Sequence, residues 1–218
     1  MTRVKICCIS SIEEAQLAIK SGVSALGLVS AMPSGPGVIS EELISQIAEQ
    51  TPPGISTFLL TSKQYLKEII EQQRRCKTNT IQICDKIVRG THSQLKQVLP
   101  GIKIVQVIHI TGEESINEAF EVSKNVDALL LDSGNQKLAV KELGGTGRIH
   151  DWTISRKIVE SVKVPVFLAG GLNAENVADA VKQVKPFGVD VCSGVRTNGK
   201  LDEQKMKSFF TNLKTVLQ

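Results

Sequence analysis

Two apolar segments near the C-terminus stop at glycine, and they are the clearest candidates for a ligand-binding backbone in this chain. They read VFLAGGLN over residues 166–173 and GVDVCSG over residues 188–194. Because glycine has no side chain, the backbone there can approach a ligand closely and converge its N–H groups on an anion. Two such loops in succession, late in a chain of alternating strands and helices, predict a site for a phosphate group.

Cys7 is a candidate base or nucleophile at the end of an expected strand, Val4–Cys8. Strand alternation places Lys5 and Cys7 on one face, and Ile6 and Cys8 on the other. A thiolate can accept a proton or attack an electrophile if its neighbours lower its pKa. The alternative is that Cys7 is a small buried hydrophobe, as most free cysteines are. We expect Cys8 to face a helix and to be structural.

Two aspartates occupy positions that are unusual for a charged side chain. Asp132 follows the apolar run Ala128–Leu131 directly, and a carboxylate there is costly unless it meets a partner or the mouth of a site. The alternative for Asp132 is a cap in a turn, where aspartate is common. Asp190 lies inside the last apolar strand, which disfavours aspartate. We therefore expect Asp190 either to be paired inside the fold or to contact a ligand.

Other polar residues give weaker signals. The glycine-rich stretch 144–147 lies in a long loop, and alone it is as typical of a flexible loop as of a binding site. His109 either lines the mouth or floor of the site or is a structural residue. No cluster of His, Cys and Asp has the spacing of a metal site, so we expect no metal.

The elements that must position these residues alternate throughout the chain. Short apolar runs rich in β-branched residues are typical of parallel strands buried on both faces. We expect strands at Val4–Cys8, Ala25–Val29, Ile55–Leu60, Thr80–Cys84, Lys103–Ile108, Ala128–Asp132, Val164–Leu168 and Phe187–Val191. Amphipathic segments predict helices at Ile12–Ser21, Ser40–Glu49, Lys63–Arg75, Thr91–Val98, Glu113–Lys124, Thr153–Ser161, Ala174–Gln183 and Asp202–Val216. Ser11 with Glu14 fits a capping box, and Asn173 fits a helix start.

Eight strand–helix pairs favour a single (β/α)8 barrel domain that spans residues 1–218. The units average about 27 residues, so the whole chain of 218 residues is compact for a barrel, which typically has roughly 250 residues. The alternative, an open doubly wound sheet, would normally carry a glycine-rich fingerprint after the first strand, where this chain has Cys7–Ser10. The longest irregular segments, Ser30–Ile39 and Ser133–Asp151, follow strand ends, where barrel enzymes carry their active sites.

Composition bounds the partners and the location of the protein. The chain has 218 residues, 41% hydrophobic and 22% charged, with a formal net charge of +4. This balance is typical of a soluble globular protein, and the small, scattered charge predicts no nucleic-acid partner. No apolar run approaches about 18 residues and no signal-peptide pattern opens the chain, so we expect no membrane partner. Five cysteines without the spacing of a disulfide framework favour reduced thiols in the cytoplasm.

Taken together, these motifs resemble the phosphoribosylanthranilate isomerase family of tryptophan biosynthesis. The matching segments follow the order and spacing of the family over essentially the whole chain, and they are most specific in its second half. They are Val4–Cys7, Ala25–Val29, Leu130–Ser133, Gly144–Gly147, Asp151–Trp152, Ala169–Val177 and Gly188–Val195.

The resemblance implies a barrel without cofactor that performs an Amadori rearrangement, from an N-linked phosphoribosyl aminoaldose to an aminoketose. It implies that Asp132 is the general acid, which protonates the furanose ring oxygen. Cys7 would be the general base, which removes the proton on C2. The implied phosphate ligands are Gly171, Ser193 and Gly194, mainly through backbone N–H groups, and the other implied substrate contacts are Asp190 and Lys5.

The chain departs from the family around the expected substrate. Cys8 stands where the family usually has glycine after the base. Gly37 stands where an arginine usually pairs with the anthranilate carboxylate, a contact that glycine cannot make. The fourth strand ends in Cys84–Asp85 instead of His-Gly, and Arg196 stands where glutamate is usual. Arg148 and Arg196 are candidates to replace the missing arginine.

Three hypotheses follow for the function. The first is a phosphoribosylanthranilate isomerase with a rebuilt carboxylate site. The second is a related isomerase that acts on another phosphorylated aminosugar. The third is a non-catalytic barrel that binds a phosphorylated ligand or only a partner. Retention of both Cys7 and Asp132 argues against the third, because a binding protein needs neither. Under the first two, the partner is a phosphorylated small molecule and the protein is a monomer or a homodimer.

Overall fold

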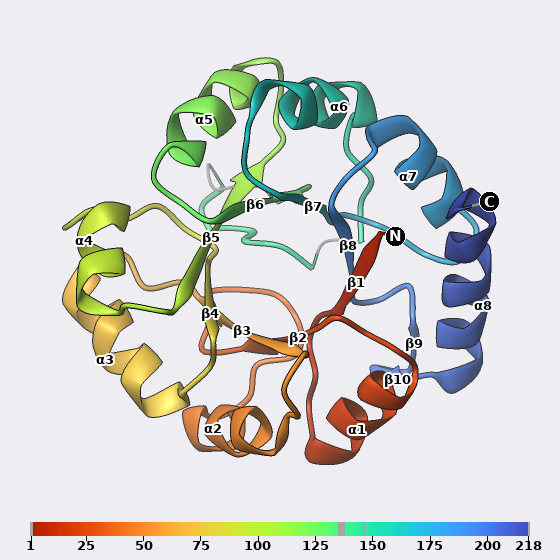
Figure 1. Ribbon diagram of the computed structural model, residues 1–218, viewed down its shortest axis with the longest axis horizontal. Coiled ribbons are helices and arrows are strands. Elements are labelled where there is room, and N and C mark those ends of the chain that lie inside the picture. The colour runs from red at the N-terminus through yellow and green to blue at the C-terminus, as the bar shows by residue number, and fades with distance from the viewer. Residues whose placement is uncertain (1, 135–137, 146, 218) are drawn as a thin grey trace.

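The computed structural model describes residues 2–134, 138–145 and 147–217, and its main sheet is a closed parallel barrel (Figure 1). The barrel strands lie side by side in chain order: β1 Arg3–Ile6, β2 Ala25–Val29, β3 Ser56–Thr61, β4 Thr80–Ile83, β5 Lys103–His109, β6 Ala128–Asp132, β7 Val166–Leu168 and β8 Gly188–Val191. β1 pairs with both β2 and β8, with Lys5 opposite Asp190, and this pairing closes the barrel. The (β/α)8 barrel expected from the sequence is confirmed.

Helices surround this barrel, and each follows a strand as the alternating pattern predicts (Figure 1). They are α1 Ile12–Lys20, α2 Glu41–Gln50, α3 Leu66–Cys76, α4 His92–Val98, α5 Glu114–Ser123, α6 Trp152–Ser161, α7 Val177–Val184 and α8 Glu203–Lys214, which a short 3-10 helix, Thr215–Leu217, extends. A two-stranded antiparallel hairpin, β9 Arg196–Thr197 and β10 Lys200–Leu201, lies between β8 and α8. This hairpin was not predicted from the sequence.

The apolar side chains form two layers because successive strand residues point to opposite faces. Outward-facing residues such as Leu129 and Leu131 pack against the helices. Inward-facing residues such as Leu130 fill the barrel, where Phe58 and Phe167 make an edge-to-face contact with ring centroids 5.9 Å apart. Alternation therefore places Asp132, two residues after Leu130, on the interior face.

Two helix starts differ from the sequence prediction. Ser11 caps α1 by accepting from the Glu14 N–H at 3.2 Å, but the Glu14 carboxylate does not complete the capping box with Ser11. Asn173 does not cap α7, which begins at Val177. Instead Asn173 and Asn176 accept hydrogen bonds from each other's backbone N–H, and this closed turn delays the helix.

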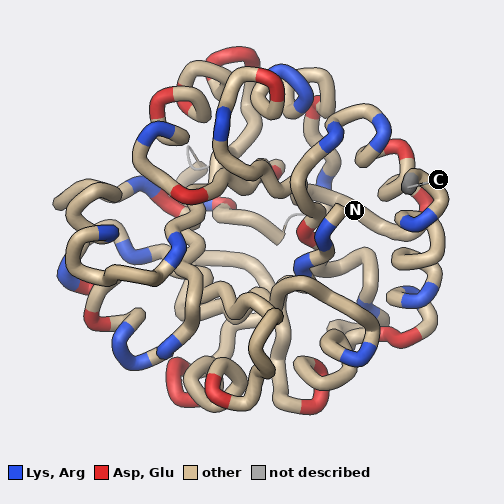
Figure 2. Tube along the Cα trace, viewed as in Figure 1, with Lys and Arg blue, Asp and Glu red and all other residues tan. Residues whose placement is uncertain are grey.

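Positions of charged residues of both signs are distributed around the ring of helices (Figure 2). None of the helices in the described ranges is long and apolar enough to cross a membrane.

Candidate active site

A cavity lies at the carboxyl ends of the strands. Five of the seven residues proposed from the sequence line it: Cys7, Asp132, Gly171, Asp190 and Ser193. The other two contact or adjoin lining residues: Lys5 forms an ion pair with Asp190, and Gly194 follows Ser193 in the chain. The structure therefore brings the sequence-predicted residues together at one end of the barrel.

Cys7 lies directly after β1, and its backbone N–H donates to the Val191 carbonyl at 2.9 Å. Gly27 on the neighbouring strand makes room for the thiol. A Cβ at Gly27 would stand 3.1 Å from Cys7 Sγ and 3.0 Å from Lys5 Nζ. Lys5 and Cys7 thus share the interior face, as strand alternation predicts.

Asp190 is both paired inside the barrel and exposed to the cavity. Its Oδ2 accepts from Lys5 Nζ at 2.8 Å, and both side chains are buried. Burial alone would lower the pKa of Lys5, but Asp190, together with Cys7 and Cys8, outweighs burial and raises that pKa. Among the described residues, Asp190 Oδ1 has no hydrogen-bond partner. That oxygen is a buried acceptor without a partner in the described part of the chain, in a residue that lines the cavity.

Asp132 ends β6 and is buried. Its Oδ1 accepts from the Ser133 N–H at 2.7 Å, and a Cβ at Gly144 would stand 2.6 Å from its Oδ2. Burial raises the pKa of Asp132, against the opposing effects of the Ser133 N–H and the His109 ring. A carboxyl group with a raised pKa keeps its proton to higher pH and can donate it. His109 lies beside Asp132 in the sheet, and its Nε2 contacts the Cys84 carbonyl at 3.0 Å.

The two glycine-ended loops pack against each other. Gly171 has φ +63°, a region that favours glycine, and a Cβ there would stand 2.9 Å from the Gly147 carbonyl oxygen. A Cβ at Gly194 would stand 2.0 Å from the Leu172 carbonyl oxygen, and Asn173 pairs with Gly194 as a parallel bridge. A side chain at Gly194 would therefore force the two loops apart, and one at Gly171 would push away the neighbouring loop that carries Gly147. Thr146, within the glycine-rich stretch 144–147, lies outside the described residues.

Cys8 lines the cavity rather than facing a helix, which corrects the sequence-based expectation. Its φ is +61°, so the left-handed backbone turns the side chain away from the regular strand direction. Its Sγ lies 3.6 Å from the Pro36 carbonyl oxygen, and a Cβ at Gly37 would stand only 2.4 Å from Cys8 Cβ. Contact with Cys192 and Cys7, together with burial, raises the pKa of the Cys8 thiol.

The Cys8 and Gly37 departures are therefore parts of one packing arrangement. Residue 37 cannot carry a side chain while Cys8 occupies this position. None of the described residues that line the cavity is Lys or Arg. Arg196 is buried with its guanidinium against Glu14, and Arg148 pairs with Glu142. Neither arginine lines the cavity as a replacement for the missing one.

An apolar part of the cavity lining was not predicted from the sequence. Gln82 and Cys84 reach it from the fourth strand and its end, and burial raises the pKa of the Cys84 thiol. The remaining apolar lining comes from Val29, Met32, Leu60, Leu143 and Ala169. Residues 82 and 84 lie two apart at the end of a strand, so alternation was the signal that could have found them.

Known proteins of similar sequence indicate the family of this chain. The family described as N-(5'-phosphoribosyl)anthranilate (PRA) isomerase matches residues 4–212. N-(5'-phosphoribosyl)anthranilate isomerase 2 of Methanosarcina mazei is 36% identical over 209 residues, covering 95% of this chain and 92% of the relative.

Solved structures agree with the sequence relatives. N-(5'-phosphoribosyl)anthranilate isomerase from Pyrococcus furiosus superposes with a TM-score of 0.82 at 29% identity, covering 99% of this chain and 100% of the other. A phosphoribosyl anthranilate isomerase in complex with reduced 1-(o-carboxyphenylamino)-1-deoxyribulose 5-phosphate gives a TM-score of 0.79 at 26% identity, with the same coverage. This chain therefore belongs to the N-(5'-phosphoribosyl)anthranilate isomerase family.

Proposed function

We propose that the protein isomerises N-(5'-phosphoribosyl)anthranilate to the corresponding aminoketose by an Amadori rearrangement. The observation that carries this proposal is the placement of Cys7, Asp132 and the two glycine-ended loops around one cavity. The family membership of the chain and the sugar phosphate analogue bound by one of its structural relatives support the same reaction.

In this reaction Asp132 is the general acid. It protonates the furanose ring oxygen, the ring opens, and the glycosylamine becomes a Schiff base. The raised pKa of Asp132 supports this role because it keeps the acid form available. Cys7 then removes the proton on C2, and the resulting enolamine tautomerises to the ketone. Both residues line the cavity, as a donor and an acceptor for one sugar must.

The phosphate is held at the glycine-ended loops in this proposal. Gly171, Ser193 and Gly194 supply backbone N–H groups, and close packing of the two loops supports a shared anion site. Asp190 Oδ1 accepts a hydrogen bond from a sugar hydroxyl, while Lys5 holds the other carboxylate oxygen in place.

The lack of Lys and Arg among the described residues that line the cavity favours a second candidate, an isomerase for a phosphorylated aminosugar that lacks the anthranilate carboxylate. Since no Lys or Arg stands among the described lining residues, a carboxylate there has only neutral donors such as Ser34 and Gln82. Retention of Cys7 and Asp132 keeps the reaction type unchanged in this candidate.

Turnover of phosphoribosylanthranilate by the purified, reduced protein tests the main proposal. Loss of anthranilate-type fluorescence is expected, and no turnover overturns it. The matched comparison is the aniline analogue, which lacks only the carboxylate. The second candidate requires a higher kcat/KM for that analogue than for phosphoribosylanthranilate.

We further infer that the protein acts in the cytoplasm as a monomer or homodimer. Its five cysteines are all free thiols, which supports a reducing compartment. Analytical ultracentrifugation distinguishes the two assembly states.

A further inference from the structure

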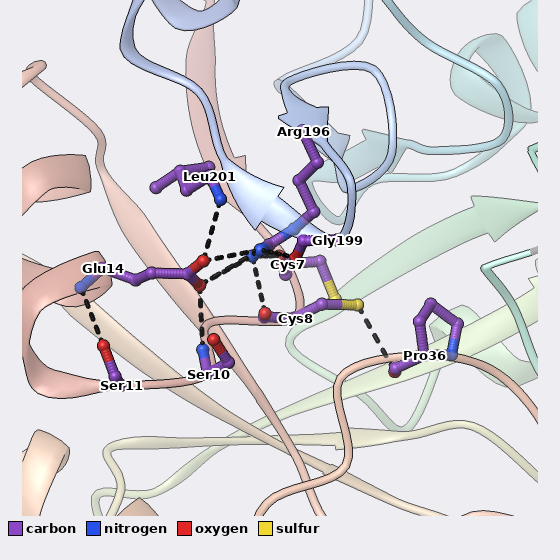
Figure 3. A network of polar contacts seen from close by, with 9 residues as sticks. All are labelled: Cys7, Cys8, Ser10, Ser11, Glu14, Pro36, Arg196, Gly199 and Leu201. Carbon is purple, nitrogen blue, oxygen red and sulfur yellow. Dashed lines mark hydrogen bonds and ion pairs between the residues drawn. The ribbon is translucent and has the colours of Figure 1, made fainter.

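Arg196 is a buried arginine whose guanidinium gathers contacts from several segments (Figure 3). Its Nη2 donates to the Cys8 carbonyl at 2.6 Å and to the Cys7 carbonyl at 3.2 Å. Its Nη1 donates to Glu14 Oε1 at 2.9 Å and to the Gly199 carbonyl at 3.0 Å. The two Nη2 contacts are made to the backbone of the proposed base, Cys7, and of the residue after it.

We propose that Arg196, held by Glu14, is a positioning residue that fixes the Cys7 thiol relative to the phosphate loop. The inference rests on the proposed function, in which Cys7 is the base. Arg196 itself does not line the cavity. It therefore acts through the backbone of Cys7 and Cys8 rather than by touching the substrate.

The backbone at this point needs an external support. Cys8 adopts φ +61°, a left-handed conformation that costs free energy in a residue with a Cβ. Such a conformation persists only where its surroundings hold it, and the two carbonyl contacts from Arg196 do so. The planar guanidinium matches this task, because it presents several N–H donors in a fixed geometry.

Glu14 holds the arginine in turn. Its carboxylate accepts from the Ser10 N–H at 3.0 Å and the Leu201 N–H at 2.8 Å, besides its ion pair with Arg196. Burial opposes the charge, but Arg196 and these N–H groups outweigh it and lower the pKa of Glu14. The carboxylate thus stays charged at neutral pH, where it can pair with Arg196.

The same residue reaches the phosphate loop through its own backbone. The Arg196 N–H donates to the Ser193 carbonyl at 3.1 Å. Arg196 therefore connects the proposed base to the loop that holds the proposed phosphate ligands Ser193 and Gly194. Because a reaction of this kind is sensitive to the placement of the base by fractions of an ångström, this connection bears on kcat.

The test compares Arg196→Met, Arg196→Lys and Glu14→Gln with Ile69→Val, a core variant on α3 that lowers stability far from the cavity. Two quantities are measured on the full chain. One is kcat and KM for phosphoribosylanthranilate. The other is the rate at which iodoacetamide alkylates Cys7, resolved by peptide mass spectrometry.

We expect Arg196→Met to lower kcat by about tenfold or more, to change KM little, and to speed alkylation of Cys7 because the loop is no longer held. Arg196→Lys restores part of kcat, since lysine keeps the charge but not the planar fork. Glu14→Gln shifts both readouts in the same direction as Arg196→Met. Ile69→Val lowers Tm and leaves both readouts unchanged.

Wild-type kcat and alkylation in folded Arg196→Met overturn the proposal, as does a loss of kcat that merely follows Tm across all variants. If Arg196→Met does not fold, Arg196→Lys and Glu14→Gln decide by the same criteria. If the wild type does not turn over phosphoribosylanthranilate, the proposed function fails. The alkylation rates then still decide whether Arg196 fixes Cys7.

Discussion

Burial raises the pKa of the Asp132 carboxyl group. The raised pKa keeps a proton available for catalysis, but it also makes the folded protein less stable when the carboxyl group ionises. Because its pKa is higher in the folded than in the unfolded chain, the unfolded state loses its proton first as pH rises. Stability from this group is therefore present at low pH and is lost as pH rises through the raised pKa.

Asp132→Asn should separate these two effects. The amide carries no charge at any pH, so we expect a Tm at pH 8 equal to or above that of the wild type. The variant cannot donate a proton, so kcat should fall by about 10²-fold or more. Thermal melts at pH 5 and pH 8, together with kcat, check both points. A lower Tm at pH 8 with nearly full activity would contradict the assigned role.

Cys8 and Gly37 should be energetically coupled because their packing leaves no room for a second side chain. We expect Gly37→Ala to be strongly destabilising in the wild type and less so in a Cys8→Gly background, which removes the 2.4 Å contact with Cys8 Cβ and leaves the 2.8 Å contact with the backbone Cα. The double-mutant cycle should give a coupling free energy of at least about 1 kcal/mol. Denaturant unfolding of the four proteins measures it. Strict additivity would show that the two departures from the family are independent.

His150, in the loop before α6, should make the stability of the protein depend on pH. Burial lowers the pKa of His150 from 6.5 to about 4, and its Nε2 contacts Ser155 Oγ at 2.7 Å. The unfolded chain takes up this proton as pH falls below 6.5, while the folded protein resists protonation until about pH 4. Stability from this group is therefore present above pH 6.5 and is lost progressively between those two values.

His150→Gln removes this titration while keeping a polar side chain. We expect the variant to lose less Tm than the wild type between pH 7 and pH 4.5, measured in the same buffers. Equal losses in the two proteins would show that His150 is already protonated or is exposed in the native state.

Most elements could be predicted because strand alternation and apolar periodicity are local properties of the sequence. The bounds Ala25–Val29 and Ala128–Asp132 agree with the structure, and most other strand ends differ by one or two residues. The hairpin β9–β10 was missed because its strands are short and polar. Its turn, Asn198-Gly199, has φ +51° and +78°, and Asn-Gly is the usual signal for such a turn.

The site could be predicted only where its residues stand at strand ends. Cys7, Asp132 and Asp190 follow from their position in apolar strands and from the family resemblance. The left-handed backbone of Cys8 and the placement of Arg196 could not be predicted. Both depend on contacts between residues far apart in the chain, such as Arg196 with Cys8.

At the scale of the whole molecule, the barrel joins the two ends of the chain. β1 pairs with β8, and the buried ion pair of Lys5 and Asp190 crosses that junction. We propose that residues 1–218 form one folding unit, since removing the last strand leaves the first without a neighbour on one side.

This arrangement predicts one cooperative unfolding transition. The fluorescence of Trp152 on α6 and the far-ultraviolet circular dichroism of all helices should give the same denaturant midpoint. Two separate midpoints would show that part of the barrel unfolds by itself.

The central claim is that Cys7 is the base of an Amadori rearrangement in this barrel. The most direct measurement is kcat of Cys7→Ser against the wild type, followed by the loss of phosphoribosylanthranilate fluorescence. We predict turnover by the wild type and a kcat about 10²-fold or more lower in the variant, with KM little changed. A Cys7→Ser variant with wild-type kcat, or one affected only in KM, would contradict the account.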